Sequence, residues 1–121
     1  MSIVVFDIGG SAVKYGLWQD EALSRKGSFE TPKSWNAMKN EMKSVFDGFA
    51  ATDSIEGVAI SSPGAVDSVA GIVGGISAVP YIHHFPIKAE WEGLFGVPVS
   101  IENDANCAAL AEVWLGAAKD V

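Results

Sequence analysis

Three short runs rich in β-branched and aromatic residues precede any helical pattern, and this order strongly constrains the fold of the chain. The first run, Ser2–Ile8, ends at the pair Gly9-Gly10, and the second spans Ala12–Trp18. The third and more polar run spans Leu23–Glu30. Strands joined by short connections pair antiparallel, because a parallel pair needs a crossover of a dozen residues or more. We therefore expect residues 2–30 to form an antiparallel meander.

Helical spacing of apolar residues follows the meander. Ser34 is expected to cap a helix in which Trp35, Met38, Met42 and Phe49 share one face. The later elements expected are a strand at Ile55–Ile60, a glycine-rich and weakly structured stretch at Ser61–Ile76, a helix with Pro86 as its first residue and Gly96 at its end, a strand at Val97–Ile101, and a helix at Ala105–Leu115. The order predicts one α/β domain over residues 1–121, with helices packed on a mixed five-stranded sheet.

Composition excludes several classes of protein. A chain of 121 residues with 49% hydrophobic residues can bury a core of its own. The net charge of −7 argues against a nucleic-acid partner and against binding to an anionic membrane surface. No apolar run reaches the roughly 18–20 residues that span a bilayer, and the N-terminus lacks a signal-peptide pattern. With Cys107 as the sole cysteine, the sequence predicts a cytoplasmic protein without an internal disulfide.

An acid followed by two glycines separates the first two expected strands. The Gly9-Gly10 turn carries no side chain, so backbone groups can approach a phosphate, and Ser11 and Lys14 can add a hydroxyl and a charge. Asp7 would repel a phosphate, and its natural role is to hold Mg²⁺ against the phosphate oxygens. The alternative is a plain β-hairpin in which Asp7 belongs to the turn.

Asn103 and Asp104 lie between an expected strand and an alanine-rich helix. Such a position puts both residues at the carboxyl edge of the sheet, where α/β proteins bind ligands. Asp104 could accept the proton of an attacking hydroxyl, and Asn103 could bind a neighbouring sugar hydroxyl. The alternative is that the pair caps the following helix. Glu102 is interpreted as a surface or network residue.

Two glycine-containing loops are candidates for contact with a small polar ligand. Gly64 follows the fourth expected strand, and Ser77 lies in a second loop that begins at Gly74-Gly75. On these residues alone, an ordinary Pro-Gly turn is the favoured explanation of the first loop, and an ordinary loop explains the second equally well. The adjacent His83 and His84 are interpreted as residues of a surface loop rather than metal ligands, because no cysteine or carboxylate cluster accompanies them.

The segments FDIGGSAVKYGL, AISSPGAVDSVAGIV and IENDANCAALAE together resemble the ROK family (repressors, open reading frames and kinases) of the actin-like sugar kinase superfamily. The likeness runs collinearly from about Ser2 to Gly116. Ser11 stands where the family usually has threonine, which keeps the hydroxyl. The resemblance implies a ribonuclease-H-like lobe of the actin-like ATPase fold.

For the sugar side, the resemblance implies that Asp104 is the general base on the attacking hydroxyl. It also implies that Asn103 binds an adjacent hydroxyl, and that Gly64, Ala65 and Ser77 line the sugar pocket. The substrate would be a hexose or amino sugar, with a glucose-type hexose favoured over the other family substrates.

For the phosphate side, the resemblance implies that Asp7, Gly9, Gly10 and Ser11 face the phosphates of ATP and their Mg²⁺. Lys14 would assist there.

The chain lacks the second glycine-rich phosphate loop, the Glu-x-Gly-His segment, the cysteine-rich zinc site of many members and the adenosine pocket of family kinases. We therefore expect it to be the N-terminal lobe of a sugar kinase, inactive on its own because phosphoryl transfer needs both substrates positioned together. Two alternatives stay open: a sugar-sensing transcriptional regulator of the same family, and a non-catalytic actin-like interaction module. Apolar surface left by an absent second lobe would favour self-association, for example as a homodimer.

Overall fold

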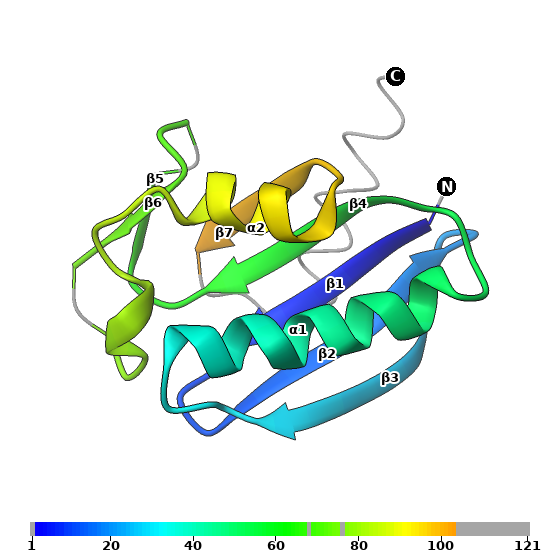
Figure 1. Ribbon diagram of the computed structural model, residues 1–121, viewed down its shortest axis with the longest axis horizontal. Helices are drawn as coiled ribbons and strands as arrows, with labels where there is room; N and C mark the ends of the chain where they lie inside the picture. The colour runs from blue at the N-terminus through cyan, green and yellow to red at the C-terminus, as the bar shows by residue number, and fades with distance from the viewer. Residues whose placement is uncertain (1, 68, 76, 104–121) are drawn as a thin grey trace.

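The computed structural model describes residues 2–67, 69–75 and 77–103. Within these residues the chain forms a five-stranded sheet, a two-stranded hairpin and two α-helices (Figure 1). In chain order the elements are β1 (Ser2–Ile8), β2 (Ala12–Gln19), β3 (Ala22–Glu30), α1 (Trp35–Ala50), β4 (Ile55–Ser62), β5 (Ala65–Asp67), β6 (Ile72–Gly74), a 3₁₀ turn (Pro80–Ile82), α2 (Ile87–Phe95) and β7 (Val99–Asn103).

The large sheet is mixed, as the sequence predicts, and its strand order is β3-β2-β1-β4-β7. Strands β1, β2 and β3 pair antiparallel, which confirms the expected meander. Strand β4 joins β1 in parallel after the α1 crossover, and β7 joins β4 in parallel after α2. The three neighbouring strands β1, β4 and β7 therefore run in the same direction and end at the same edge.

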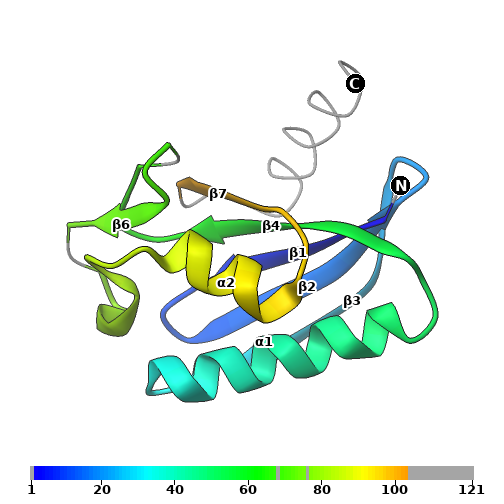
Figure 2. The same ribbon diagram turned by 45° about the horizontal axis from the view of Figure 1, so that its top comes forward.

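Both helices pack on one face of this sheet (Figures 1 and 2). The alternate residues Val4, Phe6 and Ile8 of β1 turn toward the helices and are fully buried there. The helices contribute fully buried side chains to the same cluster, among them Met38 of α1 and Trp91 of α2. The amphipathic pattern of both helices is thus explained by burial against one sheet face.

Local sequence signals determine where the helices begin and end. The Ser34 hydroxyl accepts a hydrogen bond from the Ala37 amide at 3.2 Å, which confirms the expected cap of α1. Gly96 ends α2 in the left-handed conformation, with φ 72°, and its amide donates to the Glu92 carbonyl at 2.8 Å. Helix α2 begins at Ile87, one residue after the predicted start, because Pro86 occupies the capping position.

The stretch Ser61–Ile76 was expected to be weakly structured, and this expectation is wrong for its described residues. Strand β4 continues to Ser62, because β7 supplies a parallel partner as far as Asn103. Strands β5 and β6 then pair antiparallel as a hairpin. The Asp67 carboxylate accepts hydrogen bonds from two amides of the hairpin turn, at 3.2 and 3.0 Å, so one side chain organises this connection.

The fifth strand of the sheet is shifted relative to the prediction, since it begins at Val99 rather than at Val97. Proline has no amide hydrogen to donate to a sheet ladder, and the strand begins directly after Pro98. The predicted helix Ala105–Leu115 lies outside the described residues. Within the described part of the chain, no helix has the length and apolar character needed to cross a membrane.

Candidate functional site

The carboxyl ends of β1, β4 and β7 bring the sequence-predicted residues of distant segments to one edge of the sheet. In the parallel register Asp7 lies beside Ser61, and Ser61 lies beside Glu102. One position further along, Ser62 lies beside Asn103. Loops that leave neighbouring parallel strands at their carboxyl ends form the usual ligand crevice of α/β proteins. The topology therefore creates a candidate site at this edge.

The turn between β1 and β2 is held by backbone groups and by one threonine. The Gly9 amide donates to the Ala12 carbonyl at 3.0 Å, which closes the turn. Thr31, directly after β3, donates its hydroxyl to the Gly9 carbonyl at 2.7 Å and its amide to the Ser11 carbonyl at 3.0 Å. Both ends of the turn are thus fastened to the end of the neighbouring strand.

Neither glycine of the turn leaves room for a side chain. A Cβ on Gly9 would lie 2.9 Å from the Ala12 carbonyl oxygen, and a Cβ on Gly10 would lie 2.9 Å from the Ala78 Cβ. The absence of side chains lets backbone groups approach a phosphate closely. The contact between Gly10 and Ala78 also places this turn directly against the loop that carries Ser77.

Two charged residues flank the turn on neighbouring strands. Asp7 and Lys14 are directly opposite in the antiparallel register of β1 and β2. Lys14 is exposed and Asp7 is partly buried. A carboxylate oxygen is the type of ligand that Mg²⁺ prefers, and an exposed ammonium group suits a phosphate. The residues at this turn therefore fit a magnesium-bound phosphate group.

A cleft of about 460 Å³ opens beside the turn, between Ser11, Lys33 and Tyr81. The Tyr81 hydroxyl donates a hydrogen bond to the Pro32 carbonyl and so ties the 3₁₀ turn to the segment after β3. Burial raises the pKa of Tyr81 above its ordinary value of 10.0. The cleft is polar as well as apolar, as a small polar ligand requires.

Gly64 and Ser77 lie in adjacent loops on the other side of the edge. Gly64 follows β4 in the left-handed region, with φ 92°, and a Cβ there would lie 2.9 Å from a methyl group of Val73. Ala65 begins β5 and pairs with Gly74 of β6, which brings the hairpin back toward Ser77. The β5–β6 hairpin is therefore the scaffold that places these two predicted site residues near each other.

His83 joins these loops, and its role is not evident from the sequence. Its Nε2 lies 2.7 Å from the Ser77 hydroxyl, and its Nδ1 lies 3.1 Å from the Gly74 carbonyl oxygen. Both histidines lie in the loop before α2; His84 is exposed, whereas His83 is half-buried and bonded through both nitrogens. Among the described residues, no cluster of potential metal ligands includes either histidine.

Asn103 ends β7 at the candidate edge, and Asp104 lies outside the described residues. The position of Asn103 is set by its partner Ser62, which is fully buried two residues before Gly64. Strand β7 therefore ends at the edge that also carries the two glycine-containing loops.

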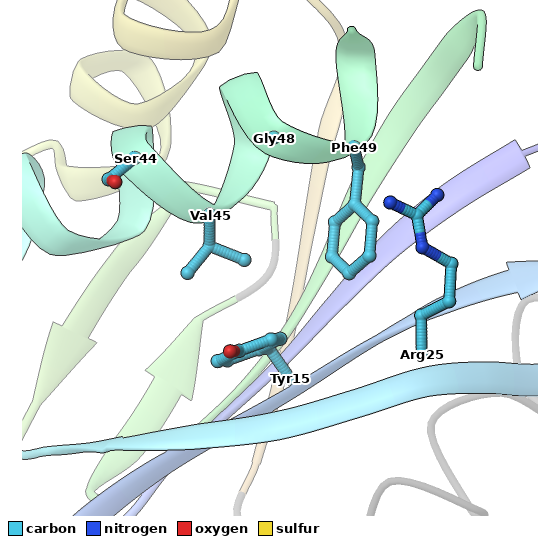
Figure 3. A pocket seen from close by; sticks show the side chains of 6 residues that line it. All are labelled: Tyr15, Arg25, Ser44, Val45, Gly48 and Phe49. Carbon is cyan, nitrogen blue, oxygen red and sulfur yellow. The ribbon is translucent and has the colours of Figure 1, made fainter. Parts of the chain in front are cut away.

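A second hollow of about 390 Å³ lies between α1 and strands β2 and β3, lined by Tyr15, Arg25 and Phe49 among others (Figure 3). Its cation is already engaged, because Arg25 forms an ion pair of 3.0 Å with Asp53 and lies over the Phe49 ring at 4.8 Å. None of the sequence-predicted site residues lines this hollow. The edge of the sheet is therefore the better candidate.

The chain is similar in sequence to known sugar kinases. The β-glucoside kinase of Listeria monocytogenes is 39% identical over an alignment of 123 residues, which covers 100% of this chain and 41% of that protein. The N-acetyl-D-glucosamine kinase of Aliivibrio salmonicida is 31% identical over 119 residues, covering 95% of this chain and 39% of that protein. This chain thus spans about two fifths of the length of these relatives.

Solved structures show the same fold. The crystal structure of a ROK family glucokinase from Streptomyces griseus in complex with glucose and AMPPNP matches with a TM-score of 0.78 and 27% identity, over 90% of this chain and 35% of that one. A family model described as the ROK family matches residues 3–121. The chain belongs to the ROK family, whose kinases have the actin-like ATPase fold.

Proposed function

We propose that this chain is the sugar- and phosphate-binding N-terminal lobe of an ATP-dependent kinase that phosphorylates a hydroxyl of a hexose or amino sugar. The observation that supports it most strongly is the convergence of β1, β4 and β7 at one edge. The turn suited to phosphate, the Gly64 and Ser77 loops and the Asn103 position all lie there.

On the phosphate side, Gly9, Gly10 and Ser11 present backbone groups and a hydroxyl, and Lys14 contributes a positive charge. Asp7 supplies a carboxylate oxygen for Mg²⁺. When bound, magnesium-ATP supplies the phosphoryl group and neutralises its developing charge. These residues position the phosphates rather than react with them.

On the sugar side, Asp104 removes the proton from the attacking hydroxyl. Asn103 binds the neighbouring hydroxyl, and Gly64, Ala65 and Ser77 line the pocket. The assignment of Asp104 as the base is supported by its place in the sequence, directly after Asn103, the last residue of β7. Because the Listeria relative is a β-glucoside kinase, we propose a glucose-type sugar, free or as a β-glucoside, as the substrate.

The test is Asp104→Asn in the full-length protein that carries this lobe. We expect kcat to fall by about 10²–10⁴-fold while the dissociation constant of the sugar changes little, because the amide keeps the shape but cannot take a proton. Asp20→Asn, in the β2–β3 turn at the opposite end of the sheet, is the matched control and should retain full activity. A loss of less than tenfold in kcat for Asp104→Asn would remove Asp104 from the role of base.

A further inference from the structure

The imidazole of His83 contacts three separate segments of the candidate site. Its two nitrogens reach the Ser77 hydroxyl and the Gly74 carbonyl, at 2.7 and 3.1 Å. Its Cε1 lies over the turn after β4, where a Cβ on Gly64 would be only 2.7 Å away. One ring therefore joins the end of β6, the loop after it and the turn that follows β4.

The hydrogen-bond partners determine which nitrogen carries the proton when the ring is neutral. A carbonyl oxygen only accepts, so Nδ1 must donate to Gly74. In the neutral ring Nε2 then has no proton and accepts from the Ser77 hydroxyl. The direction of the Ser77 bond is thus fixed by a carbonyl on the far side of the ring.

This arrangement leaves the Ser77 oxygen as an acceptor toward a ligand. Its proton is donated to His83, and one of its two lone pairs accepts from the Val79 amide at 3.1 Å. The Val79 carbonyl oxygen, at 3.4 Å, is the more distant acceptor for the same proton. The second lone pair is used by neither His83 nor the Val79 amide and suits a hydroxyl donor such as that of a sugar. The ring itself is held in place from the backbone, because the next residue, His84, donates its amide to the Val73 carbonyl at 2.8 Å.

We propose that His83 is a positioning residue of the sugar pocket: it fixes the Ser77 hydroxyl as a hydrogen-bond acceptor for a substrate hydroxyl and holds the Gly64 turn against β6. The assignment of a sugar to this pocket rests on the proposed function. The contact between the ring and its three neighbours does not depend on it.

Two substitutions in the full-length enzyme separate the two bonds of the ring. His83→Gln places an amide oxygen where Nε2 lies and keeps an acceptor for Ser77. His83→Asn places an amide nitrogen near Nδ1, so it keeps the bond to Gly74 and loses the one to Ser77. In His83→Asn we expect KM for the sugar to rise about tenfold with kcat little changed, which is the effect expected from the loss of one hydrogen bond. In His83→Gln we expect KM for the sugar to return most of the way to the value of the unmodified enzyme.

Ser77→Ala should raise KM to a similar extent, and combining it with His83→Asn should add little, because both changes remove the same acceptor. His84→Asn is the matched control and should leave KM unchanged, because His84 is exposed and asparagine tolerates its φ of 67°. Additive losses from His83→Asn and Ser77→Ala, or a KM for His83→Asn equal to that of the control, would overturn the proposal.

Nitrogen-15 NMR of the neutral imidazole of His83 in the unmodified protein gives a readout without catalysis. A proton on Nδ1 is expected, and a proton on Nε2 would overturn the proposal. If the full-length protein phosphorylates no sugar, the proposed function fails, whereas the NMR result still decides the geometry of His83.

Discussion

The two halves of the candidate edge are built in different ways. The Gly9-Gly10 turn connects adjacent strands and is closed by backbone hydrogen bonds, and the Thr31 hydroxyl donates to it. The Gly64 and Ser77 loops are brought together by a hairpin and by the two ring nitrogens of His83. A turn built from glycines and backbone groups suits a ligand group of constant chemistry, such as a phosphate. Loops that are joined by side chains can instead differ in sequence and shape, and so can accept different ligands.

This difference corresponds to the two substrates that we propose. A phosphate group can be bound by the backbone N–H groups of a turn. A sugar pocket must discriminate between hydroxyl patterns, and discrimination depends on which polar side chains donate and which accept. Changes on the sugar side should therefore alter sugar affinity, and changes on the phosphate side should alter nucleotide affinity.

The largest effect on stability is expected from Gly64→Ala. The backbone φ of 92° disfavours any side chain at position 64, and an added Cβ would lie only 2.7 Å from the His83 Cε1. Together these effects should lower the free energy of unfolding by about 2–4 kcal/mol. Gly96 has the same left-handed conformation, with φ 72°, but a Cβ added there would meet no atom within 4 Å. Gly96→Ala should therefore lower the free energy of unfolding by only about 1 kcal/mol. Urea unfolding measures both, and equal losses would mean that packing around Gly64 is looser than described.

A smaller effect is expected from Thr31→Val. The change removes the hydroxyl that donates to the Gly9 carbonyl at 2.7 Å, which should cost about 1 kcal/mol of unfolding free energy. In steady-state kinetics of the full-length enzyme, KM for ATP should rise and KM for the sugar should not. Thr31→Ser keeps the donor and should behave as the unmodified protein. A rise in KM for the sugar, with KM for ATP unchanged, would contradict the assignment of the Gly9-Gly10 turn to the phosphates and of the Gly64 and Ser77 loops to the sugar.

The smallest effect concerns Asp53, which lies far from both loops. Its hydrogen bond from Gln19, followed by that from Thr52 and the charge of Arg25, holds the pKa of the Asp53 carboxyl below its ordinary value of 3.8. Because the folded pKa is lowered, the stabilisation is present above about pH 4 and is lost as the pH falls through the folded value. We therefore expect that, when the midpoint of urea unfolding is measured over a series of pH values, Asp53→Asn shows a smaller decrease at acid pH than the unmodified protein. KM for either substrate should not change.

The sheet could be predicted from the sequence because its signals are local. Short apolar strands, the Ser34 cap and the Gly96 end each act over a few residues, and together they predicted the mixed five-stranded sheet and both described helices. The β5–β6 hairpin was missed, because each strand has only three residues and the Asp67 turn lies within a glycine-containing stretch. Periodicity cannot identify strands of that length.

The candidate site was predicted in part. The meeting of the Asp7, Gly64 and Asn103 segments follows from the parallel order of β1, β4 and β7, which a strand pattern indicates. His83 was not predicted, because its partners lie six and nine residues away in a loop without regular spacing. A histidine directly after the buried Ile82 was the available signal, and it has many ordinary explanations.

The most direct test of the account is a crystal structure of the full-length protein with a glucose-type sugar and a non-hydrolysable ATP analogue. The account predicts that the terminal phosphate lies against the backbone of Gly10 and Ser11. It also predicts that the sugar lies within hydrogen-bond distance of Asn103 and Ser77, with its attacking hydroxyl beside Asp104. A sugar bound in the hollow of Tyr15 and Arg25, or an analogue whose phosphates lie away from the Gly9-Gly10 turn, would contradict it.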